Sequence, residues 1–366
     1  MAGMRSRLRH GAGVSELVVG DGPEFVQREL AEWVAERQIF VVTSAPVWAL
    51  YGGAYCAALG AGGDGGAVFE LPDGEAAKTP AVAGDLWQRM LAAGGRRDSR
   101  VVTFGGGTVT DVGGFVAATF MRGLAVSHVP TTVLAQVDAA IGGKSAVNLP
   151  AAKNIVGAFH HPDKVVTPTA VLDSLPAREL RAGLAEVVKM AVLLDGELLT
   201  LLEHDLSSLL DDPGDARWQA LIATAQRAKA AVVERDPKEQ GERRVLNFGH
   251  TLGHAIEAVL GYGVLLHGEA VAHGMRFATR LAAARGLESD FEHRLDPLIR
   301  RLSPRPLPEL SVERLLEAVG RDKKAERRGP VWVLPRGVGS WHPVRLRADE
   351  IAGELADFLA AANRGC

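Results

Sequence analysis

The first part of the chain alternates short β-rich runs with helical stretches, and this alternation constrains the fold more than any other feature. Such alternation is typical of a parallel β-sheet whose strands are joined by helices. We expect strands at residues 15–19, 39–43, 67–70, 100–104 and 125–129. We expect helices between them at residues 24–37, 45–59, 80–93 and 109–119. The sequence therefore predicts an α/β N-terminal domain with a Rossmann-like parallel sheet.

The pattern changes after Leu172, where helical periodicity takes over and few β-rich runs interrupt it. We expect helices at 177–195, 197–210, 217–234, 251–259, 268–284 and 311–319, and a short hairpin formed by 329–334 and 339–344. Ser174 and Pro176 precede the first of these helices in the manner of a helix cap. The sequence thus predicts an α/β domain at residues 1–173 and a mainly α-helical domain at residues 174–366.

Charge and cysteine content exclude several classes of protein. The chain has 41 basic and 44 acidic side chains and a net charge of −3, which argues against a nucleic-acid-binding protein. Its two cysteines cannot build a disulfide framework or a cysteine-based zinc site. Residues 40–63 lack charge, but Pro46 and several glycines argue against a membrane helix. The basic N-terminus has no apolar run behind it, so we expect no signal peptide and a cytoplasmic location.

A glycine loop follows the expected strand at 100–104. Gly105, Gly106 and Gly107 lead directly into a helical stretch. Glycines let backbone N–H groups approach an anion, and the helix N-terminus adds a favourable dipole. Thr131 and Thr132 follow the next expected strand, at the edge where ligands bind in open α/β sheets. The loop predicts a phosphate or dinucleotide site, although a tight strand–helix turn would account for the same glycines.

Three histidines and a carboxylate form a possible metal-binding set. His250 and His254 are four residues apart, which places both imidazoles on one face of a helix. His267 begins another helix, and Glu186 lies upstream on the first long helix of the second domain. Two histidines and one carboxylate leave an open position on zinc, as in catalytic sites. A zinc peptidase is disfavoured because no H-E-x-x-H motif is present. The alternative is ordinary surface or core histidines.

Lysine is rare in this chain, with nine lysines among the 41 basic residues. Lysines that persist in such a chain mark positions where a compact ammonium is needed. Several lie in or near the segments above, which favours an anionic substrate carrying phosphate and carboxylate groups; solvated surface charge is the alternative. These cations are Lys144, Lys153, Lys189, Lys229, Arg243 and Lys324. A metal together with a nucleotide loop suggests alcohol chemistry that exchanges hydride with a nicotinamide.

These motifs, in this order and spacing, resemble the dehydroquinate synthase family of sugar-phosphate cyclases over roughly residues 70–335. The resemblance rests on PDGEAAKT (72–79), GGGTVTDVGGF (105–115), FMRG (120–123), VPTTVLAQVDAAIGGKSAVN (129–148), KNIVGAF (153–159), GLAEVVKM (183–190), RVLNFGHTLGHAIE (244–257) and HGEAVAHGM (267–275). It implies an NAD-containing, zinc- or cobalt-dependent homodimer. It also implies a lyase of the shikimate pathway that cyclises a seven-carbon keto acid phosphate (DAHP) to 3-dehydroquinate with loss of phosphate and no net redox change.

The resemblance also assigns roles to residues. The metal ligands would be Glu186, His250 and His267. The catalytic groups would be His254, Lys144, Lys189, Asn247, Lys229 and Arg243, with His254 handling a proton. The substrate would also contact Asp138, Lys153, Asn154, Lys324 and, across a dimer, Arg122. The NAD site would use Glu75, Lys78, Gly105, Gly106, Gly107, Asp111, Thr131 and Thr132, with Lys144 and Lys153 nearby.

Other functions remain open at this point. Thr167-Pro168 and Ser44-Ala45-Pro46 depart from the family's usual residues, which leaves room for an amino-dehydroquinate synthase or another sugar-phosphate cyclase of secondary metabolism. A metal-dependent polyol dehydrogenase would share the general architecture, but a neutral polyol gives Lys144, Lys189 and Arg243 nothing to bind. A non-catalytic binding module would leave a metal set beside a nucleotide loop unexplained.

Overall fold

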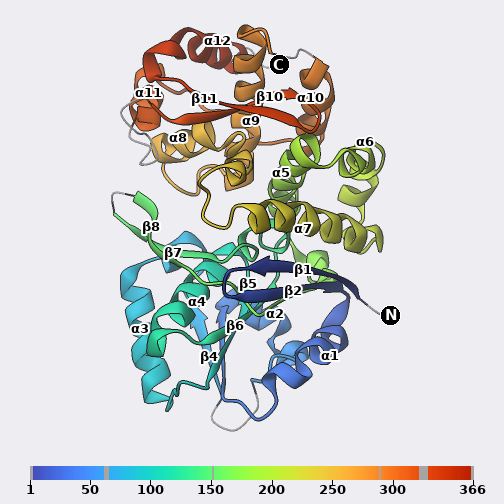
Figure 1. Ribbon diagram of the computed structural model, residues 1–366, viewed down its shortest axis with the longest axis vertical. Helices are drawn as coiled ribbons and strands as arrows, with labels where there is room; N and C mark the ends of the chain where they lie inside the picture. The colour runs from blue at the N-terminus through green and yellow to red at the C-terminus, as the bar shows by residue number, and fades with distance from the viewer. Residues whose placement is uncertain (1–2, 62–65, 151, 288–289, 321–328, 364–366) are drawn as a thin grey trace. The chain divides into compact units, whose positions relative to one another are not determined.

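The computed structural model describes residues 3–61, 66–150, 152–287, 290–320 and 329–363 (Figure 1). The chain forms two compact units. Unit 1 comprises Met1–Pro176 and Asp212–Pro237, and unit 2 comprises Ala177–Asp211 and Lys238–Cys366. The chain first passes from unit 1 to unit 2 between Pro176 and Ala177, close to the expected boundary between residues 173 and 174. The expected single division nevertheless does not describe the units, because residues 212–237 pack with unit 1.

Unit 1 is built on a seven-stranded sheet. Its strands, in spatial order, are β1 (Met4–His10), β2 (Gly13–Gly20), β9 (Lys164–Pro168), β6 (Ala125–Pro130), β5 (Arg100–Gly105), β3 (Ile39–Ser44) and β4 (Ala67–Leu71). All neighbouring pairs are parallel except β1 with β2. The expected parallel sheet is confirmed, and β1 and β9 are additions to it.

Helices cover both faces of this sheet (Figure 1). They are α1 (Gly22–Val34), α2 (Ala45–Tyr55), α3 (Pro80–Ala92), α4 (Gly107–Thr119) and α7 (Arg217–Arg235). Side chains alternate between the faces of a strand. In β3, Phe40 and Val42 accordingly pack with residues of α3 and α4, whereas Ile39 and Val41 pack with residues of α1 and the end of α2. The apolar run of β3 is therefore buried on both sides.

Helix α7 joins unit 1 through its own apolar face. Ala230 and Val233 of this helix pack with Leu8, Leu17 and Val165, which lie on β1, β2 and β9. These strands would otherwise leave an apolar face in water, and burial of such a face is the main driving force for packing. The sequence places α7 among the helices of the second half, but its partners are the strands at one end of the sheet.

A two-stranded hairpin projects from the α/β layers of unit 1 (Figure 1). It consists of β7 (Lys144–Leu149) and β8 (Ala152–Phe159), which pair antiparallel. The segment contains the expected substrate and cofactor residues Lys144, Lys153 and Asn154. The sequence analysis did not predict these strands, because their residues do not alternate clearly between polar and apolar.

Unit 2 is mainly helical, as expected. Its helices are α5 (Ala177–Leu194), α6 (Gly196–Asp211), α8 (His250–Leu260), α9 (His267–Ala284), α10 (Asp290–Leu302), α11 (Val312–Gly320) and α12 (Ala352–Asn363). The expected hairpin is confirmed as β10 (Val331–Gly337) paired with β11 (Ser340–Arg345). Helices α10 and α12 were not predicted. In the described part of the chain, no helix is both long and apolar enough to span a membrane.

Glycines allow α9 to contact its neighbours closely. A Cβ on Gly268 would lie 1.8 Å from the carbonyl oxygen of Ala182 in α5, and a Cβ on Gly274 would lie 1.9 Å from the carbonyl oxygen of Gly249. No side chain fits at either position. These two contacts fix α9 against α5 and against the start of α8, and these three elements carry the candidate metal-binding residues.

Candidate active site

Three histidines of unit 2 lie together at the starts of two helices. His250 is the first residue of α8, His254 lies one turn later, and His267 is the first residue of α9. One ring nitrogen of each histidine lies within 4.8 Å of the other two. His250 and His267 are partly buried and His254 is exposed. The helical spacing of His250 and His254 brings their rings together, as the sequence indicates.

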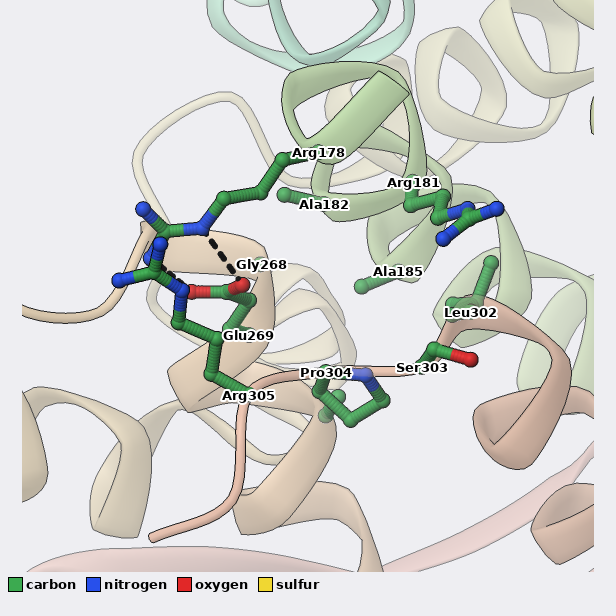
Figure 2. A pocket seen from close by; sticks show the side chains of 11 residues that line it. Arg178, Arg181, Ala182, Ala185, Gly268, Glu269, Leu302, Ser303, Pro304 and Arg305 are labelled. Carbon is green, nitrogen blue, oxygen red and sulfur yellow. Dashed lines mark hydrogen bonds and ion pairs between the residues drawn. The ribbon is translucent and has the colours of Figure 1, made fainter. Parts of the chain in front are cut away.

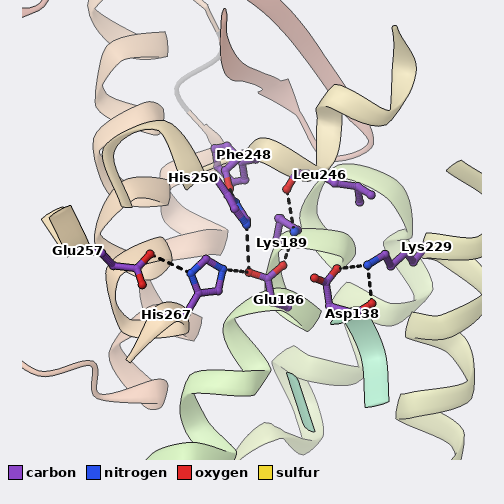
Figure 3. A network of polar contacts seen from close by, with 9 residues as sticks. All are labelled: Asp138, Glu186, Lys189, Lys229, Leu246, Phe248, His250, Glu257 and His267. Carbon is purple, nitrogen blue, oxygen red and sulfur yellow. Dashed lines mark hydrogen bonds and ion pairs between the residues drawn. The ribbon is translucent and has the colours of Figure 1, made fainter. Parts of the chain in front are cut away.

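Glu186 completes the set from α5 (Figure 3). Its Oε1 atom lies 3.6 Å from Nε2 of His250 and 3.8 Å from Nε2 of His267. Oε1 is buried and has no hydrogen-bond partner among the described residues. A buried carboxylate oxygen without a partner is costly unless a cation binds it. Ligand atoms around tetrahedral zinc lie about 3.4 Å apart, so these residues fit a divalent metal ion.

Neighbouring groups hold the outer nitrogen of each of two rings. Nδ1 of His267 lies 3.1 Å from Oε2 of Glu257, and Nδ1 of His250 lies 3.1 Å from the carbonyl oxygen of Phe248 (Figure 3). If each Nδ1–H donates a hydrogen bond to its neighbouring oxygen, Nε2 is unprotonated and its lone pair can bind a metal. Glu257 was not among the predicted site residues. It follows His250 by seven residues on α8, so the helical spacing could have indicated it.

The environment keeps His250 neutral. Burial lowers the pKa of His250 well below its ordinary value, and the Lys189 ammonium and the other two histidines act in the same direction. Lys189 is itself buried, forms an ion pair with Glu186 and donates to the carbonyl oxygen of Leu246 at 2.8 Å. A neutral imidazole is the form that binds a metal.

Two further predicted residues lie just before α8. Arg243 is buried and Asn247 is partly buried, both in a short 3₁₀ helix at Glu242–Asn247. Nδ2 of Asn247 donates to Oε1 of Glu239 at 2.5 Å, which orients the amide. Glu239 is a second residue that sequence reasoning did not identify. The predicted residues Glu186, Lys189, Arg243, Asn247 and the histidines are therefore all in unit 2.

The glycine loop of unit 1 connects β5 to α4, as expected. Gly106 is the N-cap of α4 and Gly107 its first residue. A Cβ on Gly105 would lie 2.6 Å from Val109, and one on Gly106 would lie 3.1 Å from Thr132. The N–H group of Thr131 donates to the carbonyl oxygen of Gly105 at 3.0 Å. The loop therefore lies directly beside the end of β6, with the first N–H groups of α4 at the same edge of the sheet.

Lys78 links two of the predicted cofactor and substrate residues. Its buried ammonium donates to Oδ2 of Asp111 and to Oδ1 of Asn154, both at 2.6 Å. Burial raises the pKa of the Asp111 carboxyl, and the positive charge of Lys78 acts against this effect. Asn154 lies in the left-handed region at φ +52°, and its backbone N–H donates to Oδ1 of Asn148 at 2.8 Å.

Glu75 connects the same network to the hairpin. Its Oε1 accepts a hydrogen bond from Nδ2 of Asn148 at 2.7 Å and lies 3.7 Å from the ammonium of Lys153. The structure thus brings together the predicted residues Glu75, Lys78, Asp111, Lys153 and Asn154. Asn148 is a further member that the sequence analysis did not single out.

Asp138 and Lys229 form a separate pair in unit 1 (Figure 3). Nζ of the buried Lys229, on α7, lies 2.5 Å from Oδ1 of Asp138 and 2.6 Å from its carbonyl oxygen. Asp138 lies in a short π-helix at Ala135–Ala139. Both were predicted to surround the substrate, and the packing of α7 on the sheet explains why residues 91 apart in sequence meet.

The remaining predicted residues lie at unit 1 surfaces or outside the described residues. Lys144 is exposed at the start of β7. Met121 and Arg122 both have positive φ, at +51° and +68°, in the turn before β6. Such backbone strain persists only where the surroundings impose it, and it is frequent at ligand sites. Lys324 lies outside the described residues.

Comparison with known proteins defines the family. A family model described as the N-terminal part of 3-dehydroquinate synthase matches residues 68–182, and one described as its C-terminal part matches residues 183–325. A 3-dehydroquinate synthase from Geobacter metallireducens is 45% identical over 313 residues, which make up 85% of this chain and 87% of the relative. The chain belongs to the 3-dehydroquinate synthase family.

Solved structures of related cyclases share the fold of this 3-dehydroquinate synthase family member. The 2-epi-5-epi-valiolone synthase from Streptomyces hygroscopicus, with NAD⁺ and Zn²⁺ bound, has a TM-score of 0.84 and 29% identity and covers 94% of this chain and 96% of its own. A 2-deoxy-scyllo-inosose synthase complexed with carbaglucose-6-phosphate, NAD⁺ and Co²⁺ has a TM-score of 0.84 and 26% identity, with coverages of 97% and 100%. The resemblance and the fold class expected from the sequence are confirmed.

Proposed function

We propose that this chain is a 3-dehydroquinate synthase, a carbon–oxygen lyase that cyclises DAHP to 3-dehydroquinate and releases phosphate. The observation that carries the proposal is the buried Glu186 with the partly buried His250 and His267, and the Lys189 ammonium beside them, in a chain 45% identical to a 3-dehydroquinate synthase. A metal site with a fixed cation beside it suits an anionic substrate whose oxygens must be bound and polarised.

The metal ligands in this proposal are Glu186, His250 and His267, and the metal is Zn²⁺ or Co²⁺. The unpartnered Oε1 of Glu186 and the two nearby Nε2 atoms support the assignment. Three protein ligands leave a position for a substrate oxygen, which is the arrangement of catalytic zinc. The nearby His254 is exposed and lies on the same face of α8 as His250. We assign it to proton transfer at a substrate hydroxyl.

The cofactor in this proposal is NAD. The loop of Gly105, Gly106 and Gly107 offers close backbone approach and the N-terminus of α4 to a pyrophosphate. Thr131 and Thr132 lie beside the loop, and Lys78 is fixed by Asp111. When bound, NAD would supply reversible hydride exchange at a hydroxyl carbon, and a metal held by Glu186, His250 and His267 would supply polarisation of the oxygen on that carbon. A recycled cofactor of this kind gives no net redox change.

The predicted cations bind the anionic groups of the substrate in this proposal. Lys189 is held by Glu186 and Leu246, so its ammonium is fixed before substrate arrives. Asn247 is oriented by Glu239. Fixed donors lower the cost of ordering the substrate and the transition state. The full substrate set comprises Lys144, Lys153, Lys189, Lys229, Arg243, Asn247, Asp138, Asn154, Arg122 and Lys324.

We further propose a cytoplasmic homodimer in which Arg122 contacts the substrate phosphate of the partner subunit. The strained backbone at Arg122 and the exposed apolar side chains of Ile155, Val156 and Phe159 on β8 support an interface in unit 1. Sedimentation equilibrium tests the dimer. A Phe159→Asp variant is expected to shift the equilibrium towards monomer if β8 forms the interface.

Two other activities are less well supported. Lys189 and Arg243 are buried cations, and a neutral polyol carries no negative charge for them to bind. This disfavours a polyol dehydrogenase. Cyclases that act on other sugar phosphates match this chain at 29% and 26% identity, below the 45% of the 3-dehydroquinate synthase from Geobacter metallireducens. An amino-dehydroquinate synthase differs by one amino group on the substrate and is tested by the same assay.

The experiment is phosphate release from DAHP by the purified full chain with NAD and either Zn²⁺ or Co²⁺. We expect rapid release that stops after EDTA treatment, returns with metal, and leaves no net NADH. Glu186→Gln is expected to abolish release, whereas the exposed Glu179→Gln on the same helix is the matched control. Absence of release from folded, metal-loaded protein, with release from the amino analogue of DAHP, would overturn the assignment of the substrate.

A further inference from the structure

A pocket of unit 2 is lined by three arginines. It has a volume of 150 Å³ and lies between α5, the start of α9 and the segment that follows α10. Arg178 and Arg181 come from α5, and Arg305 comes from the segment after α10 (Figure 2). One water needs only ~10–15 Å³ of such space, so the pocket is large enough for a small polyatomic ligand.

One of the three guanidinium groups is neutralised within the pocket. Nε and Nη2 of Arg178 donate to the two carboxylate oxygens of the buried Glu269 at 2.9 and 2.6 Å (Figure 2). Oε2 of Glu269 also accepts from the backbone N–H of Leu266 at 2.8 Å, which caps α9. Burial opposes ionisation of Glu269, but these hydrogen bonds lower its pKa overall. Glu269 is therefore an ionised carboxylate already bound to its partners.

The other two guanidinium groups have no counter-ion among the described residues. Neither the Arg181 nor the Arg305 guanidinium forms an ion pair or hydrogen bond with any residue that the structure describes, although the backbone N–H of Arg305 donates to the Glu269 carboxylate. In the view of Figure 2, Arg181 lies on the opposite side of the pocket from Arg178 and Arg305. With Glu269 as the one acidic lining residue, the lining carries a net charge of +2. Guanidinium groups bind phosphate and carboxylate oxygens through paired hydrogen bonds.

We propose that this pocket binds a small dianion of the phosphate class, with Arg181 and Arg305 as its ligands. The volume admits inorganic phosphate or the phosphate group of a small monoester, and the net charge of the lining matches a dianion. Arg181 is partly exposed and Arg305 exposed, so an anion can enter from solvent. Of the described residues proposed to bind substrate, none lines this pocket.

The pocket adjoins the contact between α5 and α9. Ala182 and Gly268 both line the pocket, and they are the two residues whose backbones meet where these helices cross. Glu186 follows one turn after Ala182, and His267 directly precedes Gly268. An anion in this pocket would therefore bind beside the crossing that positions two of the proposed metal ligands.

The experiment measures how many phosphate ions bind per chain, by equilibrium dialysis of the zinc-loaded full chain with radiolabelled inorganic phosphate. The double variant Arg181→Gln/Arg305→Gln is expected to bind one phosphate fewer than the wild type. The control Arg7→Gln/Arg336→Gln removes two exposed arginines of β1 and β10 and is expected to bind as the wild type does. Phosphate bound at the proposed active site contributes equally to the wild type and to the double variant. The difference in bound phosphate between them therefore tests this inference separately from the proposed function.

Two outcomes would overturn the inference. The first is equal phosphate binding by the wild type and the Arg181→Gln/Arg305→Gln variant. The second is an equal loss in the control, which would indicate binding to surface charge in general. If the double variant does not fold, as judged by circular dichroism, Arg181→Gln alone replaces it. If unlabelled glycerol 3-phosphate displaces the labelled phosphate from this pocket, the ligand class is a phosphate monoester. If only unlabelled inorganic phosphate displaces it, the ligand is the free ion. Crystals soaked in tungstate are expected to show an anomalous peak between Arg181 and Arg305.

Discussion

Oε1 of Glu186 lies 3.8 Å from Nε2 of His267, although the two residues are 81 positions apart in the sequence. The contact depends on Gly268, because any side chain there would collide with the backbone of Ala182 in α5. Gly268→Ala is therefore expected to separate the two helices and the two side chains. The relationship links a feature of backbone packing to the proposed metal chemistry.

Glu257 is expected to tune metal affinity without binding the metal itself. Its carboxylate accepts from Nδ1 of His267 and so favours the tautomer whose Nε2 is free. Glu257→Ala is expected to weaken Zn²⁺ binding by about 10–100-fold, as loss of such a partner does in other metal sites. Competition with a chromophoric chelator measures the affinity, with the exposed Glu292→Gln on α10 as the control. Unchanged affinity in Glu257→Ala would contradict this role.

Lys78 is expected to contribute to NAD binding. It donates to both Asp111 and Asn154, and loss of a charge-assisted hydrogen bond costs about 1.5–3 kcal/mol. If these bonds hold the site in its binding form, Lys78→Met should raise the Kd for NAD by about tenfold or more. Isothermal titration calorimetry gives the Kd. The exposed Lys238→Met serves as control, and equal Kd values for the two variants would refute the assignment.

The pair of Asp138 and Lys229 is expected to stabilise the attachment of α7 to unit 1. Removing one partner of a buried ion pair leaves an uncompensated charge, at a cost of about 3 kcal/mol. Lys229→Met should lower the free energy of unfolding by about this amount in urea titrations. The double variant Lys229→Met/Asp138→Leu should recover part of the loss because it removes both charges. A double variant less stable than Lys229→Met would count against the explanation.

His128 is expected to make stability depend on pH. Burial lowers its pKa to about 3, and Nδ1 lies 2.7 Å from the hydroxyl of Thr103. In the unfolded chain the ordinary pKa of His applies, so the unfolded state binds a proton as the pH falls below about 6.5 while the folded state stays neutral. The contribution is full above that pH and decreases towards pH 3. The loss between pH 7 and pH 5 is about 2 kcal/mol.

Urea titrations at pH 7 and pH 5 measure this effect. His128→Gln keeps a polar group near Thr103 but does not titrate, so its stability should change less over the same interval. Carboxylates also titrate near pH 5, and comparison of the two proteins removes their contribution. An equal loss of stability in wild type and His128→Gln would show that His128 does not cause the pH dependence.

Local patterns in the sequence predicted much of the site. The spacing of His250 and His254 placed them on one helical face, and the glycine loop after β5 appeared where the strand pattern put it. Both predictions depend only on residues close together along the chain. The hairpin of β7 and β8 was not predicted, because its residues do not alternate clearly between polar and apolar. Its packing on α4 and α3 stabilises it instead.

What the sequence alone determined was therefore local: the order of most strands and helices, the types of residue available for catalysis and, through its resemblance, the family. Tertiary structure decided which distant residues meet. Helix α7 belongs to unit 1 because Ala230 and Val233 bury an apolar face against β1, β2 and β9. Packing within unit 2 brings the carboxylate of Glu257 to His267, and packing within unit 1 brings the side-chain oxygen of Asn148 to Asn154. Burial and hydrogen bonding of this kind depend on the whole fold, and no short stretch of sequence carries that information.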